Sequence, residues 1–249
     1  MKRMKFVWFT LSLSITLSLL IQSCNIDQYD SFGDIPSLNA DKVSIATIQA
    51  TETNDEYFFL IDGDKKLYPG DLSSITNYKW LAGQRVFVYF NLLGEKMDGY
   101  DYNAEIVYIQ DILTKNIIPI TEETADSIGD DKINITYAWF GGGHLNIEFQ
   151  YLGTENASKP HMINLVYNEN SYSDPEYITL EFRHNAYEDS PYKLLSGIAS
   201  FKMPSSSESS HLKGVKLRVN TIYDDVKYRT VNFNEVESRI FNGEQITIR

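Results

Sequence analysis

The chain has 249 residues, of which 43% are hydrophobic and 13% aromatic, and it carries a formal net charge of −12. This much apolar material excludes a disordered chain and suffices for one large domain or two small ones. The acidic balance argues against nucleic acid as a partner, because an acidic surface repels phosphate backbones. The 17 Tyr and 13 Phe residues favour β-strands.

Residues 1–23 predict a secretory signal peptide. Three cations, Lys2, Arg3 and Lys5, precede an uncharged run, FVWFTLSLSITLSLLIQS. A basic start, a short apolar stretch and a small residue at its end form the usual signal pattern. The run is marginal for a membrane span, which needs ~20 apolar residues, and several of its members are Ser or Thr.

Cys24 is the only cysteine, and it directly follows the small residue Ser23 at the end of the apolar run. The stretch Leu20–Cys24 resembles a lipobox, in which the signal peptide is cut before a diacylated cysteine. We therefore expect an acylated Cys24, and the alternative is a buried or stray thiol. Each buried methylene contributes about 0.8 kcal/mol, so the two or three acyl chains of a lipoprotein give lasting membrane attachment.

An acylated Cys24 predicts a lipoprotein of the cell envelope, in the outer membrane and facing the periplasm or the surface. Loss of the three signal-peptide cations lowers the formal net charge from −12 to −15. With its one thiol acylated, the mature chain can form no disulfide. Residues 24–42 are polar, with Gly33 and Pro36, and predict a tether between the membrane and the folded body.

Residues 43–120 predict a small β-barrel. Runs of strand-forming residues lie at 43–50, 56–62, 84–93 and 102–114, with turn signals such as DGDKK between them. The run QRVFVYFNLL is apolar on both faces, as in a strand that is covered on both sides. Roughly five short strands match a five-stranded, OB-like closed barrel.

Residues 121–131 interrupt the strand pattern. This acidic stretch, TEETADSIGDD, is the expected linker between two domains, with room for a short helical turn. Within it, Asp126–Ser127–Ile128 resembles a bacterial O-glycosylation acceptor, which makes Ser127 a candidate modification site. The alternative is a chance occurrence of a short tripeptide.

Residues 132–249 predict an antiparallel, Ig-like β-sandwich. The segment LNIEFQY alternates, so we expect one set of side chains inward (Leu145, Ile147, Phe149 and Tyr151) and the other outward (Asn146, Glu148 and Gln150). Turn residues separate further strands, at 161–167, 176–184, 192–201, 215–221 and 225–233. The tail, 234–249, could add an edge strand at Gln245–Ile248.

The stretch EFRHNAYEDSPY, Glu181–Tyr192, contains residue types common in active sites. Strand alternation places His184 on the apolar face, and Glu181 and Arg183 on the other face, where they can pair. Ser190 lies in a loop before a proline, without the nucleophile-elbow pattern of hydrolases. A structural corner is the favoured interpretation, and a cryptic hydrolase built around His184 is the alternative.

The sequence predicts no catalytic, metal-binding or cofactor-binding residues. The four histidines lack the spacing of zinc ligands (His144, His161, His184 and His211). DGDKK lacks the spacing of a calcium loop, and the glycines of WFGGGH precede a strand rather than a phosphate-binding helix. Trp80, Tyr100 and Tyr102 could form a platform for a sugar or a peptide, although core packing is the favoured role for such rings.

Several segments resemble the NigD-like lipoproteins of anaerobic Gram-negative bacteria: YNAEIVYIQDILTKNI, ADSIGDDKI, HMINLVYN, YITLEFRHNAYEDSPYKLLSGIASF and GVKLRVNT. The likeness extends from Val43 to Phe233 and is most specific in LEFRHNA. It implies an OB-like domain followed by a β-sandwich, and it transfers no catalytic residue. The family name comes from association with a bacteriocin gene cluster.

The expected function is that of a non-enzymatic envelope lipoprotein, which binds or assists another envelope protein, a peptide or a glycan. One alternative is a bacteriocin-associated accessory or immunity factor, which rests on the family resemblance, and another is the hydrolase around His184. Because many OB folds bind oligonucleotides, oligonucleotide binding is a further alternative. Export from the cytoplasm and the acidic charge argue against it.

Overall fold

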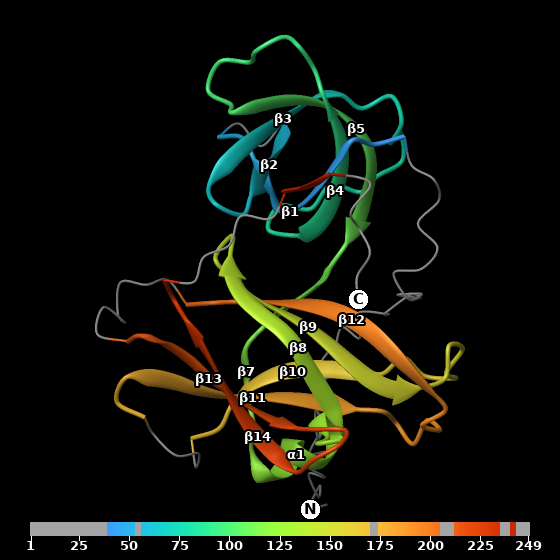
Figure 1. The fold of residues 1–249 in the computed structure, drawn as a ribbon, viewed down its shortest axis with the longest axis vertical. Coiled ribbons are helices and arrows are strands. Elements are labelled where there is room, and N and C mark those ends of the chain that lie inside the picture. Colours follow the sequence, from blue (N-terminus) through green and yellow to red (C-terminus); the bar gives the residue numbers. More distant parts are fainter. Residues whose placement is uncertain (1–38, 53–55, 170–173, 205–211, 235–239, 243–249) are drawn as a thin grey trace, which may run out of the picture.

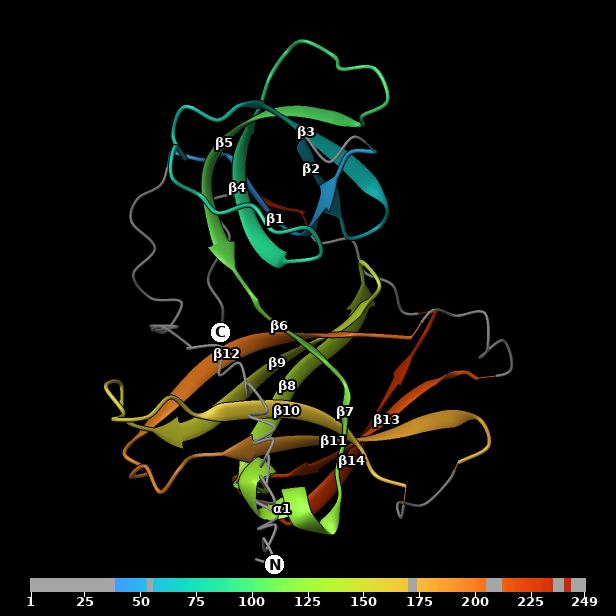
Figure 2. The same ribbon diagram turned by 180° about the vertical axis from the view of Figure 1, so that it is seen from behind.

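The computed structural model describes residues 39–52, 56–169, 174–204, 212–234 and 240–242. Within them the chain forms a β-barrel that sits on a β-sandwich (Figure 1), and the view from behind shows the same stacking (Figure 2). The predicted fold class is therefore confirmed. The expected signal peptide, Cys24, most of the tether, His211 and the strand expected at Gln245–Ile248 lie outside the described residues.

Five strands close the barrel: β1 (Lys42–Ala50), β2 (Tyr57–Ile61), β3 (Lys65–Asp71), β4 (Arg85–Leu92) and β5 (Tyr102–Asp111). They follow the order β1-β2-β3-β5-β4, and a β1–β4 pairing completes the ring. The β3–β5 pairing is parallel and the others are antiparallel. Alternate side chains of these strands fill the interior (Ala46, Ile48, Phe59, Ile61, Leu67, Val86, Val88, Phe90, Ala104, Ile106 and Ile109).

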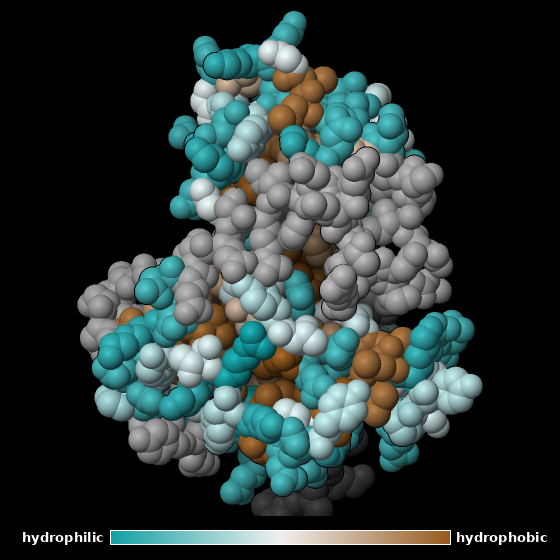
Figure 3. Space-filling view, viewed as in Figure 1, coloured by the Kyte–Doolittle hydropathy of each residue, from teal (hydrophilic) through white to brown (hydrophobic). Residues whose placement is uncertain are grey.

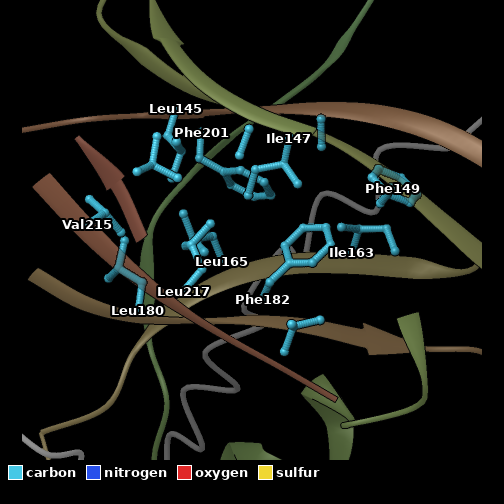
Figure 4. Packing of buried hydrophobic residues seen from close by; sticks show 14 of the residues in the cluster. Leu145, Ile147, Phe149, Ile163, Leu165, Leu180, Phe182, Phe201, Val215 and Leu217 are labelled. Carbon is cyan, nitrogen blue, oxygen red and sulfur yellow. The ribbon is translucent and has the colours of Figure 1, made fainter. Parts of the chain in front are cut away.

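Two further sheets face each other in the sandwich. One has the order β14-β13-β11-β10-β7 and the other β6-β12-β9-β8. Their strands are β6 (Leu113–Asn116), β7 (Ile118–Pro119), β8 (Ile133–Gly141), β9 (His144–Gly153), β10 (Met162–Tyr167), β11 (Tyr177–Asn185), β12 (Lys193–Lys202), β13 (Gly214–Asn220) and β14 (Val226–Asn232). Leucine, isoleucine, valine and phenylalanine side chains from both sheets meet in the layer between them (Figure 4).

Three strand pairs of the sandwich are parallel, β6–β12, β7–β10 and β11–β13, where the sequence predicts an antiparallel sandwich. The β11–β13 pair has a topological cause. The intervening β12 lies in the opposite sheet, so β11 and β13 run in the same direction beside each other. Strand alternation cannot reveal such crossings, because it reports only which face of a strand is buried.

The chain enters the sandwich at Leu113, ahead of the boundary expected at residue 120. β6 pairs with Ala199–Lys202 of β12, and β7 pairs with β10. The expected linker holds helix α1 (Glu122–Ile128), which contacts β11. Within the described ranges, no helix is long and apolar enough to cross a membrane. The run at 102–114 is thus two strands in two different sheets, which its continuous pattern does not show.

Besides the chain link, a strand pairing and an apolar cluster connect the barrel and the sandwich. The short strand β15 (Ile240–Asn242) follows the sandwich in sequence, yet it pairs with the start of β1 in the barrel sheet. An apolar cluster also joins barrel residues to Trp139 and Ile198 of the sandwich (Val43, Ile45, Phe87, Tyr89 and Ile112). Phe87 and Tyr89 are the second apolar face of β4, which the sequence predicts to be covered.

Asn146 shows the effect of this stacking on the expected sandwich pattern. The sequence predicts its side chain to point outward to solvent, as the alternation of β9 requires. It does leave the sandwich core, but it is 0% exposed, because the barrel covers this face of the sheet. The inward set is as predicted, with Leu145, Ile147 and Phe149 in the sandwich core.

Candidate functional site

The segment Glu181–Tyr192 holds the turn that follows α1. The Asn185 side-chain amide donates to the Ser127 carbonyl (3.0 Å), and the Ala186 N–H donates to the Asp131 carboxylate (2.8 Å). In return, the Asp131 N–H donates to the His184 carbonyl (2.8 Å). This part of the segment therefore fixes the path of the chain between helix and sandwich, as the structural-corner interpretation expects.

The charged residues of the segment neutralise one another and a neighbour. Arg183 Nε donates to Glu181 Oε2 (2.7 Å), which confirms the predicted pair. Arg218 binds Asp130 through both guanidinium nitrogens (2.9 and 2.8 Å), and Arg183 Nη1 lies 3.2 Å from the same carboxylate. The hydrogen bonds from Arg218 to Asp130 raise the pKa of Arg218 against the opposing effect of burial. Few of these charges are free to act on a substrate.

His184 forms a buried pair with His161. The pairing of β10 with β11 places Ile163 opposite His184, which brings the two imidazoles together although they are 23 positions apart. His161 Nδ1 lies 2.9 Å from His184 Nε2, and His161 Nε2 lies 3.1 Å from Asp189 Oδ2. His184 Nδ1 faces the Lys132 carbonyl at 3.2 Å. His184 is 1% exposed.

The partners at each end of this chain fix the direction of its hydrogen bonds. Burial, followed by the charge of His161, lowers the pKa of His184 to about 4, so His184 is neutral near pH 7. It must donate from Nδ1 to the Lys132 carbonyl, and its Nε2 therefore accepts from His161.

Asp189 closes the other end as an acceptor. Burial acts to raise the pKa of this carboxyl, but hydrogen bonds from the Thr154 N–H, the Thr154 hydroxyl and His161 outweigh burial and lower it. His161 therefore contacts His184 through Nδ1 and the Asp189 carboxylate through Nε2, so its ring joins the histidine pair to the turn that holds Asp189.

These contacts argue against a hydrolase built around His184. Both ring nitrogens of His184 are occupied, one by a backbone carbonyl and one by His161, so neither can serve as a general base for Ser190. The turn between them is held in a strained shape, with φ values of 51° at Tyr187 and 65° at Glu188. Left-handed backbone costs about 1–2 kcal/mol for such residues, and here it brings Asp189 against Thr154 and His161.

The three aromatic candidates lie in different surroundings. Trp80 packs on Tyr57 and Phe59 over the barrel core, and Tyr102 is a half-buried part of the same core. Tyr100 instead joins Phe58 and Tyr68 in a half-exposed cluster, with ring centroids 5.7 and 5.1 Å from its own.

The sequence does not predict a buried ion pair of the barrel that lies against the sandwich. The Arg85 guanidinium binds the Asp62 carboxylate at two points (2.6 and 2.8 Å), and the two side chains are 0% and 1% exposed. Arg85 also donates to Thr47 of the barrel and Asn146 of the sandwich (both 3.1 Å). A signal was present, because Arg85 continues the β4 face of Phe87 that the sandwich covers.

The remaining candidates are isolated. Ser127 is exposed on α1, with its hydroxyl donating to the Thr124 carbonyl (2.9 Å). His144 lies against the Gly142 carbonyl (2.7 Å), and burial lowers its pKa. Across the described residues, no group of three or more His, Cys, Asp and Glu side chains is placed to hold a metal ion.

Two family models together match most of the chain. The NigD-like N-terminal OB domain matches residues 45–112, and the NigD-like C-terminal β-sandwich domain matches residues 116–233. The two matched ranges meet close to the point where the chain leaves β5 and enters β6. No curated protein matches the chain significantly.

Solved structures show the same arrangement. A protein of unknown function from Bacteroides vulgatus is 28% identical, with a TM-score of 0.68, over 81% of this chain and 96% of that one. A NigD-like immunity protein from Bacteroides caccae is 18% identical (TM-score 0.58; 79% and 93% covered). A candidate lipoprotein from Bacteroides fragilis is 10% identical (TM-score 0.55; 79% and 100% covered). The last two likenesses show the fold alone.

Proposed function

The chain belongs to the NigD-like family, and on that premise we propose that it is a non-enzymatic binding or accessory module of the cell envelope, anchored through an acylated Cys24. The single observation that carries the anchor is the position of this cysteine. It is the only one in the chain, and it directly follows a small residue at the end of an apolar run. The shared fold with a candidate lipoprotein supports the same location.

The anchor is tested by the mass and the membrane partition of the native protein. We expect a mature chain that begins at Cys24 and carries two or three acyl chains, and that partitions into detergent. Cys24→Ala should abolish acylation and cleavage at this position, whereas the matched control Ser23→Ala, which keeps a small residue before the cysteine, should be processed normally. A native chain with an unmodified thiol, or one that begins elsewhere, would refute the anchor.

The non-enzymatic role rests on how the active-site-like segment is used. Arg183 binds Glu181, His184 binds His161 and a backbone carbonyl, and Asp189 binds Thr154 and His161, so we infer no converging nucleophile and base in this segment. A binding partner in the envelope, either a protein, a peptide or a glycan, fits an acidic, all-β module better than a nucleic acid does.

A second candidate function is that of a bacteriocin-associated accessory or immunity factor. It is favoured by the shared fold with the NigD-like immunity protein of Bacteroides caccae. Deletion of the gene should then change the sensitivity of the cell to a bacteriocin or its production. Unchanged sensitivity and production would remove this candidate and leave the envelope anchor standing.

Ser127 is proposed as an O-glycosylation site. Its hydroxyl lies on the exposed side of α1 and follows Asp126, as the resemblance to a bacterial acceptor requires. Ser127→Ala should lower the intact mass of the native protein by a glycan. Ser190→Ala is the matched control, since this exposed serine also follows an aspartate but precedes a proline. Equal glycan mass in both variants would refute the assignment.

A further inference from the structure

One edge of the sandwich sheet β6-β12-β9-β8 is incomplete. β9 pairs with β12 along its whole length from Lys193, but β6 pairs only with its last part, Ala199–Lys202. In the described part of the chain, no strand pairs with Lys193–Ile198 on the side away from β9. Among the residues that the structure describes, this row of strand backbone therefore has no neighbouring strand.

The backbone groups that face this open side can be assigned. Directly after β12, the Met203 N–H donates to the Gly143 carbonyl, on the β9 side. Successive residues of an antiparallel strand turn their N–H and C=O groups to alternate sides. Odd-numbered residues of β12 therefore face β9, and Leu194 and Ser196 present their backbone groups at the open edge. Leu194 is 40% exposed, and Figure 3 shows apolar atoms at the surface over this half of β12.

A gap in the core lies directly beneath the open edge. A cavity of about 20 Å³ reaches the edge at Ser196–Ile198, and side chains of both sheets line the rest of it (Leu113, Phe149, Tyr151, His161 and Ile163). Phe149 and Ile163 face each other from the two sheets at this end of the core (Figure 4). Gly197 contributes no side chain, and a Cβ there would lie 2.7 Å from the Phe149 ring.

The neighbouring edge, on β10 in the other sheet, is closed by a lysine. Lys115 Nζ donates to the Ile163 carbonyl (2.9 Å) and to the Asn164 side chain. A lysine at a sheet edge is a common protection against unwanted strand pairing. At the β12 edge, Lys193 is instead bound to Glu155. Lys115 thus covers the edge of β10, whereas Lys193 is held by Glu155 at the edge of β12.

We propose that the open edge of β12 binds an extended peptide segment of a partner protein, which adds a strand beside Lys193–Ile198. The groups left unpaired are main-chain N–H and C=O groups in strand geometry, and only another extended backbone matches their spacing. The incoming strand would lie in line with the start of β6 and cover the cavity. The inference names the site and partner class of the binding module proposed above.

The test uses the full-length protein in detergent and a phage-displayed library of seven-residue peptides. Selected peptides should protect the Leu194 and Ser196 amides from hydrogen exchange. Ser196→Pro removes one outward N–H at a position where a sheet edge tolerates proline, and it should weaken peptide binding roughly tenfold. Ser196→Ala keeps this N–H and should bind as the wild type does.

A second arm changes only the ligand, in case Ser196→Pro fails to fold. N-methylation of the selected peptide at residues that face β12 should abolish binding, and methylation at the alternate residues should leave it unchanged. The proposal is overturned if no peptide is selected, if protection maps to the barrel, or if the β12 edge is protected by a dimer of the chain itself. None of these results bears on Cys24 acylation, so failure of the edge and failure of the anchor are distinguishable.

Discussion

Two buried histidines share one hydrogen bond, and each ring has a further partner at its other nitrogen. His184 faces a backbone carbonyl and stays neutral, whereas His161 faces the Asp189 carboxylate. Each ring alone follows ordinary rules for buried polar groups, which must find partners. The sequence predicts the apolar-face position of His184 and its role at a strand end. It does not predict the pair, because the contact depends on the register of β10 on β11.

The depressed pKa of His184 makes the stability of the fold depend on pH. Its folded-state value of about 4 lies below the ordinary value of 6.5, so the unfolded chain binds the proton more readily. The free energy of unfolding should therefore be highest above pH 6.5 and should fall as the pH drops toward 4, by roughly 3 kcal/mol from this group.

Urea titrations across this pH range test the assignment. His184→Gln removes the titrating ring and should give a flatter dependence of the unfolding free energy on pH than the wild type. Ring ¹⁵N shifts near pH 7 should in addition show a neutral His184 ring with its single N–H at Nδ1. Parallel pH curves for the two proteins would contradict the role of His184.

The elements show where a strand pattern is informative and where it is not. In β9, alternation predicts the inward residues correctly and the direction of Asn146 too, but not its burial under the barrel. In β4, apolar residues on both faces do predict a second covering layer, which the sandwich provides. The change of sheet between β5 and β6 leaves no trace in the pattern, because both segments alternate in the same way.

The β8–β9 hairpin offers a test of how tightly one element fits against the barrel. Its turn residues, Gly142 and Gly143, both have positive φ (57° and 76°), as a two-residue hairpin turn requires. A Cβ at Gly142 would lie 2.4 Å from Arg85 Nη1 and 2.8 Å from Thr47 Oγ1, whereas a Cβ at Gly143 would meet nothing within 4 Å.

Alanine substitutions at the two glycines should therefore differ in cost. Gly143→Ala should lower the unfolding free energy by about 1 kcal/mol, the cost of left-handed backbone alone. Gly142→Ala should cost more, by roughly 3 kcal/mol or above, because it also forces apart the buried Arg85–Asp62 pair. Chemical denaturation of the two variants measures the difference. Equal losses would mean that the hairpin can move away from Arg85 without penalty.

For the whole molecule, the sequence predicts two β bodies but not how firmly they are joined. Composition and turn spacing are local, and they identify each body. The joining depends on contacts between residues far apart in sequence: Arg85 with Asn146, Asp62 with Trp139, and β1 with β15. A chain with only a flexible link would let barrel and sandwich unfold separately. The shared apolar cluster and the hydrogen bond from Arg85 to Asn146 predict one cooperative transition instead.

Trp139 is the residue that tests this coupling. It is 1% exposed in the cluster between the two bodies, and its indole N–H points to Asp62 at 3.5 Å. Trp139→Ala should cost about 3–5 kcal/mol, and it leaves Trp80 in the barrel as the one tryptophan after the signal peptide. Trp80 fluorescence then reports the barrel, and far-UV circular dichroism reports both bodies. We expect the two melting curves to separate in this variant, and to coincide in Tyr223→Ala, where an exposed ring is removed from a sandwich loop.

Coinciding curves in Trp139→Ala would show that the remaining connections, β15 among them, suffice to keep barrel and sandwich in one cooperative unit.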